Sequence, residues 1–112
     1  MSYGIKLLPD TLRTVAFGAI GVGYTAIGAH FNHPMRIISI KNLTNATLLF
    51  SFDGVTDHEV VPSEVGIVWD FCTNRVSTAG AFIGVGTTIY VKQSGVPTSG
   101  SVYVSCFYGY GE

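Results

Sequence analysis

Residues 36–54 read RIISIKNLTNATLLFSFDG, and this stretch decides the fold of the chain. Isoleucines dominate its first run. In its second run Leu48, Phe50 and Phe52 recur at the two-residue spacing that places side chains on one face of a strand. The polar segment 42–47 between the two runs has the composition of a turn. We therefore predict a β-hairpin with one buried face.

Similar short runs continue on both sides of this hairpin, separated by residues typical of turns. The expected strands cover 11–20, 24–31, 36–40, 48–52, 58–61, 66–72, 82–93 and 102–108. In the last run Val102, Val104 and Cys106 alternate with polar or aromatic neighbours, which favours one face in the core. About eight short strands with frequent turns are typical of an antiparallel β-sandwich, jelly-roll or Ig-like. We predict this all-β fold, with no helix longer than one turn.

The length of the chain fits one domain. Its 112 residues lie within the usual domain range of about 100–150 residues and can bury one core. Residues 1–10 end at a Pro-Asp pair, and we expect them to form an N-terminal arm that either crosses a neighbouring subunit or frays. Residues 11–112 then form the single β-sandwich domain.

Charged residues are scarce in this chain. They make up 12% of it, about half of the roughly 25% typical of soluble domains, although the hydrophobic share of 47% is ordinary. A free monomer normally keeps a charged surface, so the deficit favours a chain that covers much of its exterior with other protein subunits. The alternative is a monomer with a surface of Ser, Thr, Asn and Gly.

Charge and hydropathy also argue against two kinds of partner. A net charge of −1 without any basic run lacks the electrostatic footprint of a nucleic-acid binder, so we expect no direct contact with nucleic acid. No charged residue lies between Arg13 and Arg36, but glycines and polar residues interrupt this segment, so paired strands explain it better than a membrane span. The N-terminus shows no signal-peptide pattern, and we expect synthesis in a cytoplasm.

Aromatic residues are concentrated in the last strand and just beyond it, in a number that one strand face cannot bury. Because aromatic residues are enriched in the centres of protein interfaces, this strand and the N-terminal arm are candidate contact surfaces. The alternative is a thick core filled from both sheets. The candidate interface residues are Tyr3, Ile5, Leu7, Tyr103, Phe107, Tyr108 and Tyr110.

The densest group of possible metal ligands lies in one loop, at Asp53, Asp57, His58 and Glu59. Oxygen-rich loops of this kind bind calcium when their ligands follow a fixed spacing. Here the alternating acidic positions and the distal glutamate of the EF-hand pattern are missing, so a solvated loop is the better interpretation. We predict no metal site in this loop.

Histidines and cysteines elsewhere give no stronger signal. His30 and His33 lie close together without the cysteine pair or the His-Glu-x-x-His pattern of zinc sites. No motif around Cys72 marks it as a nucleophile, and a reducing compartment argues against a disulfide between Cys72 and Cys106. We predict a protein that is not an enzyme, with no catalytic residues, no metal and no cofactor.

Six segments of the chain together carry a resemblance to a known class of proteins. They are residues 40–46 (IKNLTNA), 49–54 (LFSFDG), 57–58 (DH), 69–74 (WDFCTN), 89–92 (IYVK) and 99–104 (SGSVYV). In this pattern of turns and strand edges the chain resembles small virion structural proteins of tailed bacteriophages. The resemblance implies a jelly-roll or Ig-like sandwich with a structural role in the virion, after synthesis in the host cytoplasm.

The resemblance implies one of two positions in the particle. The first is that of a capsid decoration (cement) protein bound across major capsid proteins, and the second is that of a ring component at the neck, the head-to-tail junction or the tail. A homo-oligomer, dimer or trimer, is expected at a local symmetry axis. The second alternative is a carbohydrate-binding module, because jelly rolls also serve as lectins and Trp69 or the tyrosines offer a ring face to a sugar.

Overall fold

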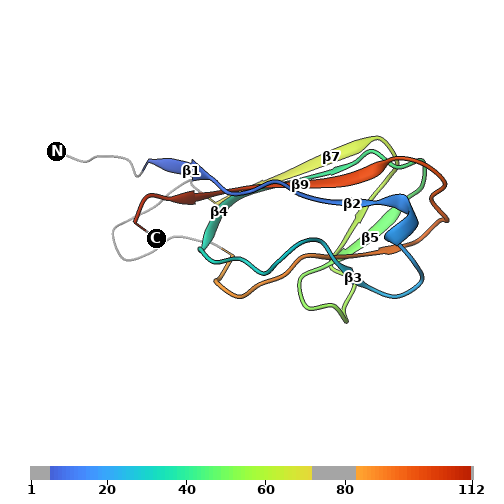
Figure 1. Cartoon of the computed structure of the whole chain (residues 1–112), viewed down its shortest axis with the longest axis horizontal. Coiled ribbons are helices and arrows are strands. Elements are labelled where there is room, and N and C mark those ends of the chain that lie inside the picture. The colour runs from blue at the N-terminus through green and yellow to red at the C-terminus, as the bar shows by residue number, and fades with distance from the viewer. Residues whose placement is uncertain (1–5, 72–82, 112) are drawn as a thin grey trace.

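The computed structural model of this chain describes residues 6–71 and 83–111, and in these residues the protein is all-β (Figure 1). The nine strands of the described residues are β1 (Leu7–Pro9), β2 (Arg13–Ala16), β3 (Thr25–Ala26), β4 (Met35–Asn42), β5 (Leu48–Ser51), β6 (Glu59–Val61), β7 (Val65–Asp70), β8 (Tyr90–Gln93) and β9 (Ser101–Gly109). A short 3-10 turn, η1 (Phe17–Ala19), follows β2. The predicted antiparallel β-sandwich is confirmed.

The strands form two antiparallel sheets, which we name sheet A and sheet B. In sheet A, β9 and β4 are central, β7 lies on one edge, and β1 and β2 pair with different halves of β9 on the other edge. Sheet B has the order β3-β8-β5-β6. From β2 to β9 the chain changes sheet at every connection except that between β5 and β6, which is the arrangement of a jelly roll. Figure 1 shows β7 and β9 in the upper layer and β5 and β3 in the lower.

The core lies between the two sheets and follows the two-residue alternation of the strands. From sheet A, β9 contributes Val102, Val104 and Cys106, which are buried as their alternation predicts. From sheet B, Leu48 and Phe50 of β5 are buried, also as predicted. The remaining core residues are Ile20, Ile27, Phe31, Met35, Ile38, Ile40, Val61, Ile89 and Val91.

The prediction of a hairpin within 36–54 is wrong. β4 belongs to sheet A and β5 to sheet B, so the segment between them carries the chain from one sheet to the other. The buried Asn42 fixes this crossing, because its Nδ2 donates to the carbonyl oxygens of Ala46 and Val61, both at 2.9 Å. Its Oδ1 accepts from the backbone N–H and the hydroxyl of Thr44, at 3.0 and 2.6 Å. The polar groups of the crossing therefore satisfy one another inside the sandwich.

Three predicted strands are much shorter in the structure. The first ends at Ala16, where η1 begins, and the second is reduced to β3, followed by Gly28 with a φ of 72°. In the third, Gly86 has a φ of 90° and turns the chain before β8. A left-handed backbone does not continue a strand, and glycine adopts it without steric cost. These glycines therefore act as turns and not as strand residues.

Candidate functional site

The first candidate site is the outer face of sheet A, which we define as the side of this sheet turned away from the core. The strand register shows which residues are neighbours on it. Tyr103 of β9 lies opposite Lys41 of β4. Phe107 of β9 lies between Ile37 of β4 and Pro9 of β1. Aromatic and aliphatic side chains from three strands are therefore adjacent on this face.

Three of the predicted interface residues belong to the outer face of sheet A. They are Leu7, Tyr103 and Phe107, which occupy outward positions of β1 and β9. β1 pairs with the last residues of β9, so residues 7–9 of the expected N-terminal arm are bound to the sheet of their own chain. Figure 1 shows this pairing at one narrow end of the sandwich.

The other predicted interface residues lie elsewhere. Tyr108 is turned to the opposite side of β9, packs against the core and stacks on His33, with ring centroids 3.8 Å apart. Tyr110 follows the end of β9 and is 69% exposed. Tyr3 and Ile5 lie outside the described residues. A contact between any of these residues and a partner stays a prediction.

Charge is sparse on the outer face of sheet A. Ser39 of β4 and Ser105 of β9 lie opposite each other between the aromatic pairs. Among the positions that the register assigns to this face, Lys41 and Asp70 carry charge, and Arg36, at the bulge of β4, is buried. A surface of this composition binds a partner by burying aromatic and aliphatic area, with hydroxyl groups to satisfy polar atoms.

Several residues of this face were not among the predicted interface residues, and two of them are aliphatic. Ile37 lies opposite Phe107, and Val68 of β7 is 64% exposed. Two-residue alternation places Val68 on the side of β7 opposite to Trp69, but it does not show which strands are its neighbours. The order β9-β4-β7 joins segments that are far apart in the sequence, so no local pattern reveals this face.

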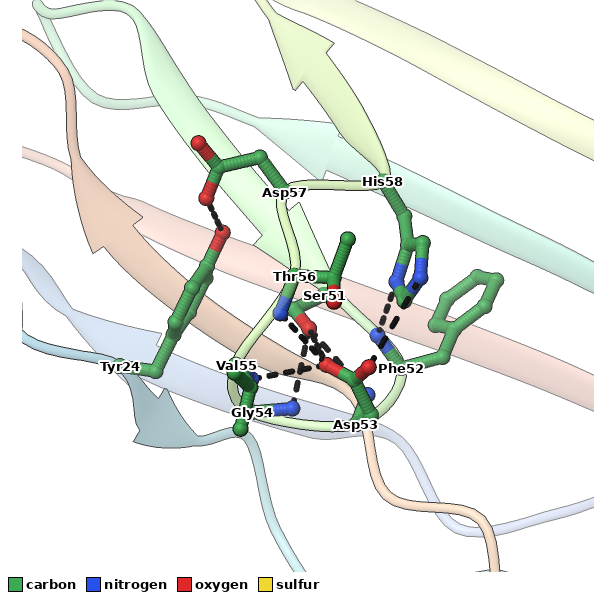
Figure 2. Close-up of polar contacts among 9 residues, drawn as sticks. All are labelled: Tyr24, Ser51, Phe52, Asp53, Gly54, Val55, Thr56, Asp57 and His58. Carbon is green, nitrogen blue, oxygen red and sulfur yellow. Dashed lines mark hydrogen bonds and ion pairs between the residues drawn. The ribbon is translucent and has the colours of Figure 1, made fainter.

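The second candidate site is the turn between β5 and β6, which we name the Asp53 turn (Figure 2). Asp53 Oδ1 accepts hydrogen bonds from the backbone N–H groups of Thr56 (2.8 Å) and Val55 (2.7 Å) and from the hydroxyl of Ser51 (2.7 Å). Ser51 Oγ accepts from the N–H groups of Asp53 (3.2 Å) and Gly54 (2.9 Å). These donors stabilise the carboxylate, and the N–H of Thr56 has the largest effect. The pKa of Asp53 is therefore held well below its usual range.

A second carboxylate of this turn, Asp57, is held by side chains from two other segments. The hydroxyl of Tyr24 donates to Asp57 Oδ1, and the Nζ atom of Lys92 lies 3.1 Å from the same oxygen. The hydrogen bond from Tyr24, followed by that from Lys92, lowers the pKa of Asp57. Desolvation, together with the bond to Asp57, raises the pKa of Tyr24 to about 12. These contacts attach the turn to sheet B.

The remaining polar groups of the Asp53 turn also bond within it. His58 Nδ1 accepts from the N–H of Phe52 at 3.0 Å, and its Nε2 lies 4.0 Å from Asp53 Oδ2. Glu59 Oε1 accepts from the N–H of the following residue at 3.1 Å. In residues 6–71 and 83–111, no three His, Cys, Asp or Glu side chains gather as a metal ion requires. The arrangement fixes the shape of the turn.

The histidines and cysteines considered from the sequence are not brought together. His30 is exposed, whereas His33 is partly buried under the ring of Tyr108. Cys106 is a buried free thiol, and burial raises its pKa to about 11, so it is protonated at neutral pH. Cys72 lies outside the described residues.

Comparison with known proteins identifies no relative. The chain matches no protein-family model, no curated protein and no solved structure. In the part of the chain that the structure describes, no helix is long and apolar enough to cross a membrane. The topology of the sandwich and the chemistry of its surfaces are therefore the features that bear on function.

Proposed function

We propose that this protein is a non-enzymatic structural protein of a tailed-bacteriophage virion, and specifically a capsid decoration protein that binds across neighbouring major capsid proteins. The observation that carries the proposal is the outer face of sheet A, where aromatic and aliphatic side chains alternate with serines and charge is sparse. Jelly rolls are common in viral capsid and lectin domains, which supports the proposal by analogy of fold. The resemblance of six segments within residues 40–104 to small virion proteins points the same way.

Binding through this face needs burial of surface and no further chemistry. A standard interface buries about 800 Å² on each partner, and apolar area contributes roughly 25 cal/mol per Å² before the costs of association. Leu7, Ile37 and Phe107 supply the apolar part of the outer face, and Ser39 and Ser105 supply hydrogen-bonding groups. Several copies held in one oligomer then stabilise a shell by avidity, even when each contact is modest.

A neck or tail ring component is the nearest alternative. The same face would then pack subunit against subunit, or subunit against the portal, around a rotational axis. The distribution of the protein separates the two positions, because a decoration protein covers the whole head whereas a ring component occupies one layer at a vertex. Electron microscopy of particles labelled on this protein distinguishes these outcomes.

A carbohydrate-binding module is the second alternative, and one observation favours it. The ring of Tyr110 is 69% exposed beyond the end of β9, where it is accessible to a sugar. Trp69 is less suited to this role, since it is partly buried and packs edge-on against Phe52 with ring centroids 5.6 Å apart. Absence of any bound glycan on a broad array would remove this alternative.

Cross-linking mass spectrometry on intact particles tests the proposal. Lys41 lies on the outer face of sheet A and Lys92 lies on sheet B, so the two lysines report on opposite layers of one molecule. We expect Lys41 to cross-link to the major capsid protein more often than Lys92 does. Cross-links confined to portal or tail proteins would replace decoration by the ring position, and absence of cross-links to any particle protein would contradict both.

A pair of variants tests the same face by add-back to particles that lack this protein. Phe107→Asp places a charge in the apolar part of the outer face, and we expect at least about a tenfold loss of particle binding. Val96→Asp places the same charge at an exposed turn position between β8 and β9 and should bind normally. Equal binding by the two variants would contradict a role for this face.

A further inference from the structure

A separate surface of this molecule is the free edge of β7, by which we mean the side of this strand that does not pair with β4. β7 pairs with β4 over six positions without a shift in register, and no other strand in the described residues pairs with it. Edge strands usually carry a lysine, a proline or a bulge, or are very short, because these features prevent pairing with other chains. β7 has no lysine, proline or bulge, and its single charge is at its end. This edge is therefore able to accept another strand.

One backbone hydrogen bond shows which groups face this edge. The N–H of Phe71 donates to the carbonyl oxygen of Arg36 at 2.8 Å. Residues of an antiparallel pair alternate between bonding to the partner strand and pointing away from it. The N–H and C=O groups of Gly66, Val68 and Asp70 therefore point away from β4, towards the free edge.

We propose that β7 pairs in antiparallel orientation with β7 of a second copy of this chain, about a twofold axis through Val68. A twofold axis perpendicular to sheet A keeps the outer faces of both copies on the same side of one continuous sheet. With the axis at Val68, this residue faces itself and Gly66 faces Asp70 of the second copy. All three are residues whose N–H and C=O groups point to the edge, so they form hydrogen-bonded pairs along the strand.

Electrostatic repulsion favours a twofold axis at Val68 over an axis at Ile67, which is the adjacent register. An axis at Ile67 would place Glu64 directly opposite Asp70 of the second copy, and like charges opposite each other in a sheet are destabilising. An axis at Val68 places Asp70 opposite Gly66, which has no side chain, and the next residue across the sheet is Lys41. The carboxylate of Asp70 in one copy and the ammonium group of Lys41 in the other therefore lie on the same face of the combined sheet, with Gly66 between them.

Apolar side chains complete the complementarity of the two strands. On the core side of sheet A, Ile67 faces Trp69 of the second copy, and both are partly buried in the single chain. On the outer side, the two Val68 side chains meet at the axis, where each is 64% exposed in the single chain. Cross-strand pairs of aromatic and β-branched residues are the pairs that stabilise a sheet. The second copy thus covers the apolar area that β7 leaves exposed.

This pairing is the form of self-association that the proposed function expects, so the inference rests on the proposed function. It is tested on the purified chain in the absence of particles. A wild-type chain that binds particles but never forms the dimer would overturn the pairing alone, and a wild-type dimer that fails to bind particles would overturn the proposed function alone.

Sedimentation equilibrium of the full chain provides the test. We expect the protein to sediment at twice its mass of 11.9 kDa. Val68→Lys places two ammonium groups face to face on the axis and should raise the dissociation constant of the dimer at least about tenfold. Val22→Lys makes the same change at a valine that is 82% exposed in the connection between η1 and β3, and it should remain dimeric.

Three results of this experiment would overturn the pairing: a monomer at every accessible concentration, a dimer undisturbed by Val68→Lys, or equal dissociation by Val22→Lys.

A cross-linking variant tests the register itself. In a Cys72→Ser background, Val68→Cys should form a disulfide-linked dimer, because Cα atoms of a hydrogen-bonded antiparallel pair lie about 5.5 Å apart, within disulfide range. Oxidation no faster than that of Val22→Cys would also overturn the pairing.

Discussion

The two edges of sheet A are built in different ways. The edge made by β1 and β2 is broken into two short strands and contains Pro9. Arg13 of β2, whose side chain is 9% exposed, anchors this edge: its Nε donates to the carbonyl oxygen of Ala29 (3.1 Å), its Nη1 pairs with Asp10 (3.1 Å), and its guanidinium lies 4.8 Å from the ring centre of Phe31. This edge is interrupted, so it does not offer a continuous strand to a partner.

The other edge of sheet A is one continuous strand, β7, and the buried side chain of Asn42 holds the connection that leads into it. Asn42, at the end of β4, bonds to the carbonyl oxygens of Val61, the last residue of β6, and of Pro62, in the connection to β7. The two edges of sheet A therefore differ in strand continuity: β1 and β2 divide one edge, whereas β7 leaves the other edge uninterrupted and available for pairing.

Replacing the interior anchor should have the largest effect on stability. Asn42→Ala removes the amide that bonds to three carbonyl oxygens and to the N–H of Thr44, although the Thr44 hydroxyl keeps its bond to Ala46 (3.1 Å), and we expect a loss of about 3 kcal/mol in the free energy of unfolding. Asn45→Ala is the matched control, because Asn45 is exposed and bonds to Thr98 alone among the contacts described. It should cost about 1 kcal/mol or less. Equal losses in urea denaturation would contradict the interior anchor.

Removal of the Arg13 side chain should have the next largest effect. Arg13→Ala removes the packing on Phe31 together with the bonds to Ala29 and Asp10, and we expect a loss of about 2 kcal/mol. Arg13→Lys keeps the charge and much of the stem and should lose less. Chemical denaturation of both variants measures this difference. A loss below about 0.5 kcal/mol for Arg13→Ala would show that the edge made by β1 and β2 does not need its arginine.

The Asp53 turn leads into β6, the edge strand of sheet B on the same side as β7, and it should respond to pH. Because the pKa of Asp53 is lowered in the folded state, its carboxylate stabilises the fold above the unfolded carboxyl pKa of about 3.9. That contribution is lost as the pH falls below this value. Asp53→Asn should flatten the acid side of the stability profile, as measured by urea midpoints. An unchanged slope in the variant would contradict the internal bonding of the turn.

Changing the free edge should have the smallest effect on the folding of the single chain. Val68 is exposed, so Val68→Lys should alter the free energy of unfolding by less than about 0.5 kcal/mol at concentrations where both proteins are monomers. Circular dichroism during denaturation at low concentration gives this value. A loss above about 1 kcal/mol would mean that Val68 is packed within its own chain, and the contrast between the two edges would then fail.

Features that depend on strand alternation could be predicted from the sequence. The burial of Val102, Val104 and Cys106 follows directly from their two-residue spacing, and so does that of Leu48 and Phe50. The all-β class followed from short runs separated by turns. The hairpin failed because a polar segment between two strands suits a turn within one sheet and a crossing between two sheets equally well.

What distinguishes these two outcomes is a contact distant in the sequence. Asn42 bonds to Val61, and local patterns do not show that bond. Local patterns also fail to show which residues are neighbours in the candidate interface. Alternation alone does place Tyr103 and Tyr108 on opposite sides of β9. The adjacency of Ile37 to Phe107 and the free edge of β7 follow from the order of the strands in sheet A.

Amide hydrogen exchange, followed residue by residue, tests most directly whether β7 is a binding edge. In the wild-type protein above its dissociation constant, the amides of Gly66 and Val68 should be as well protected as those of Ile67 and Trp69, which face β4. In Val68→Lys the amide of Gly66 should exchange rapidly while Ile67 and Trp69 stay protected. Rapid exchange at Gly66 and Val68 in the wild-type protein at high concentration would contradict pairing at this edge.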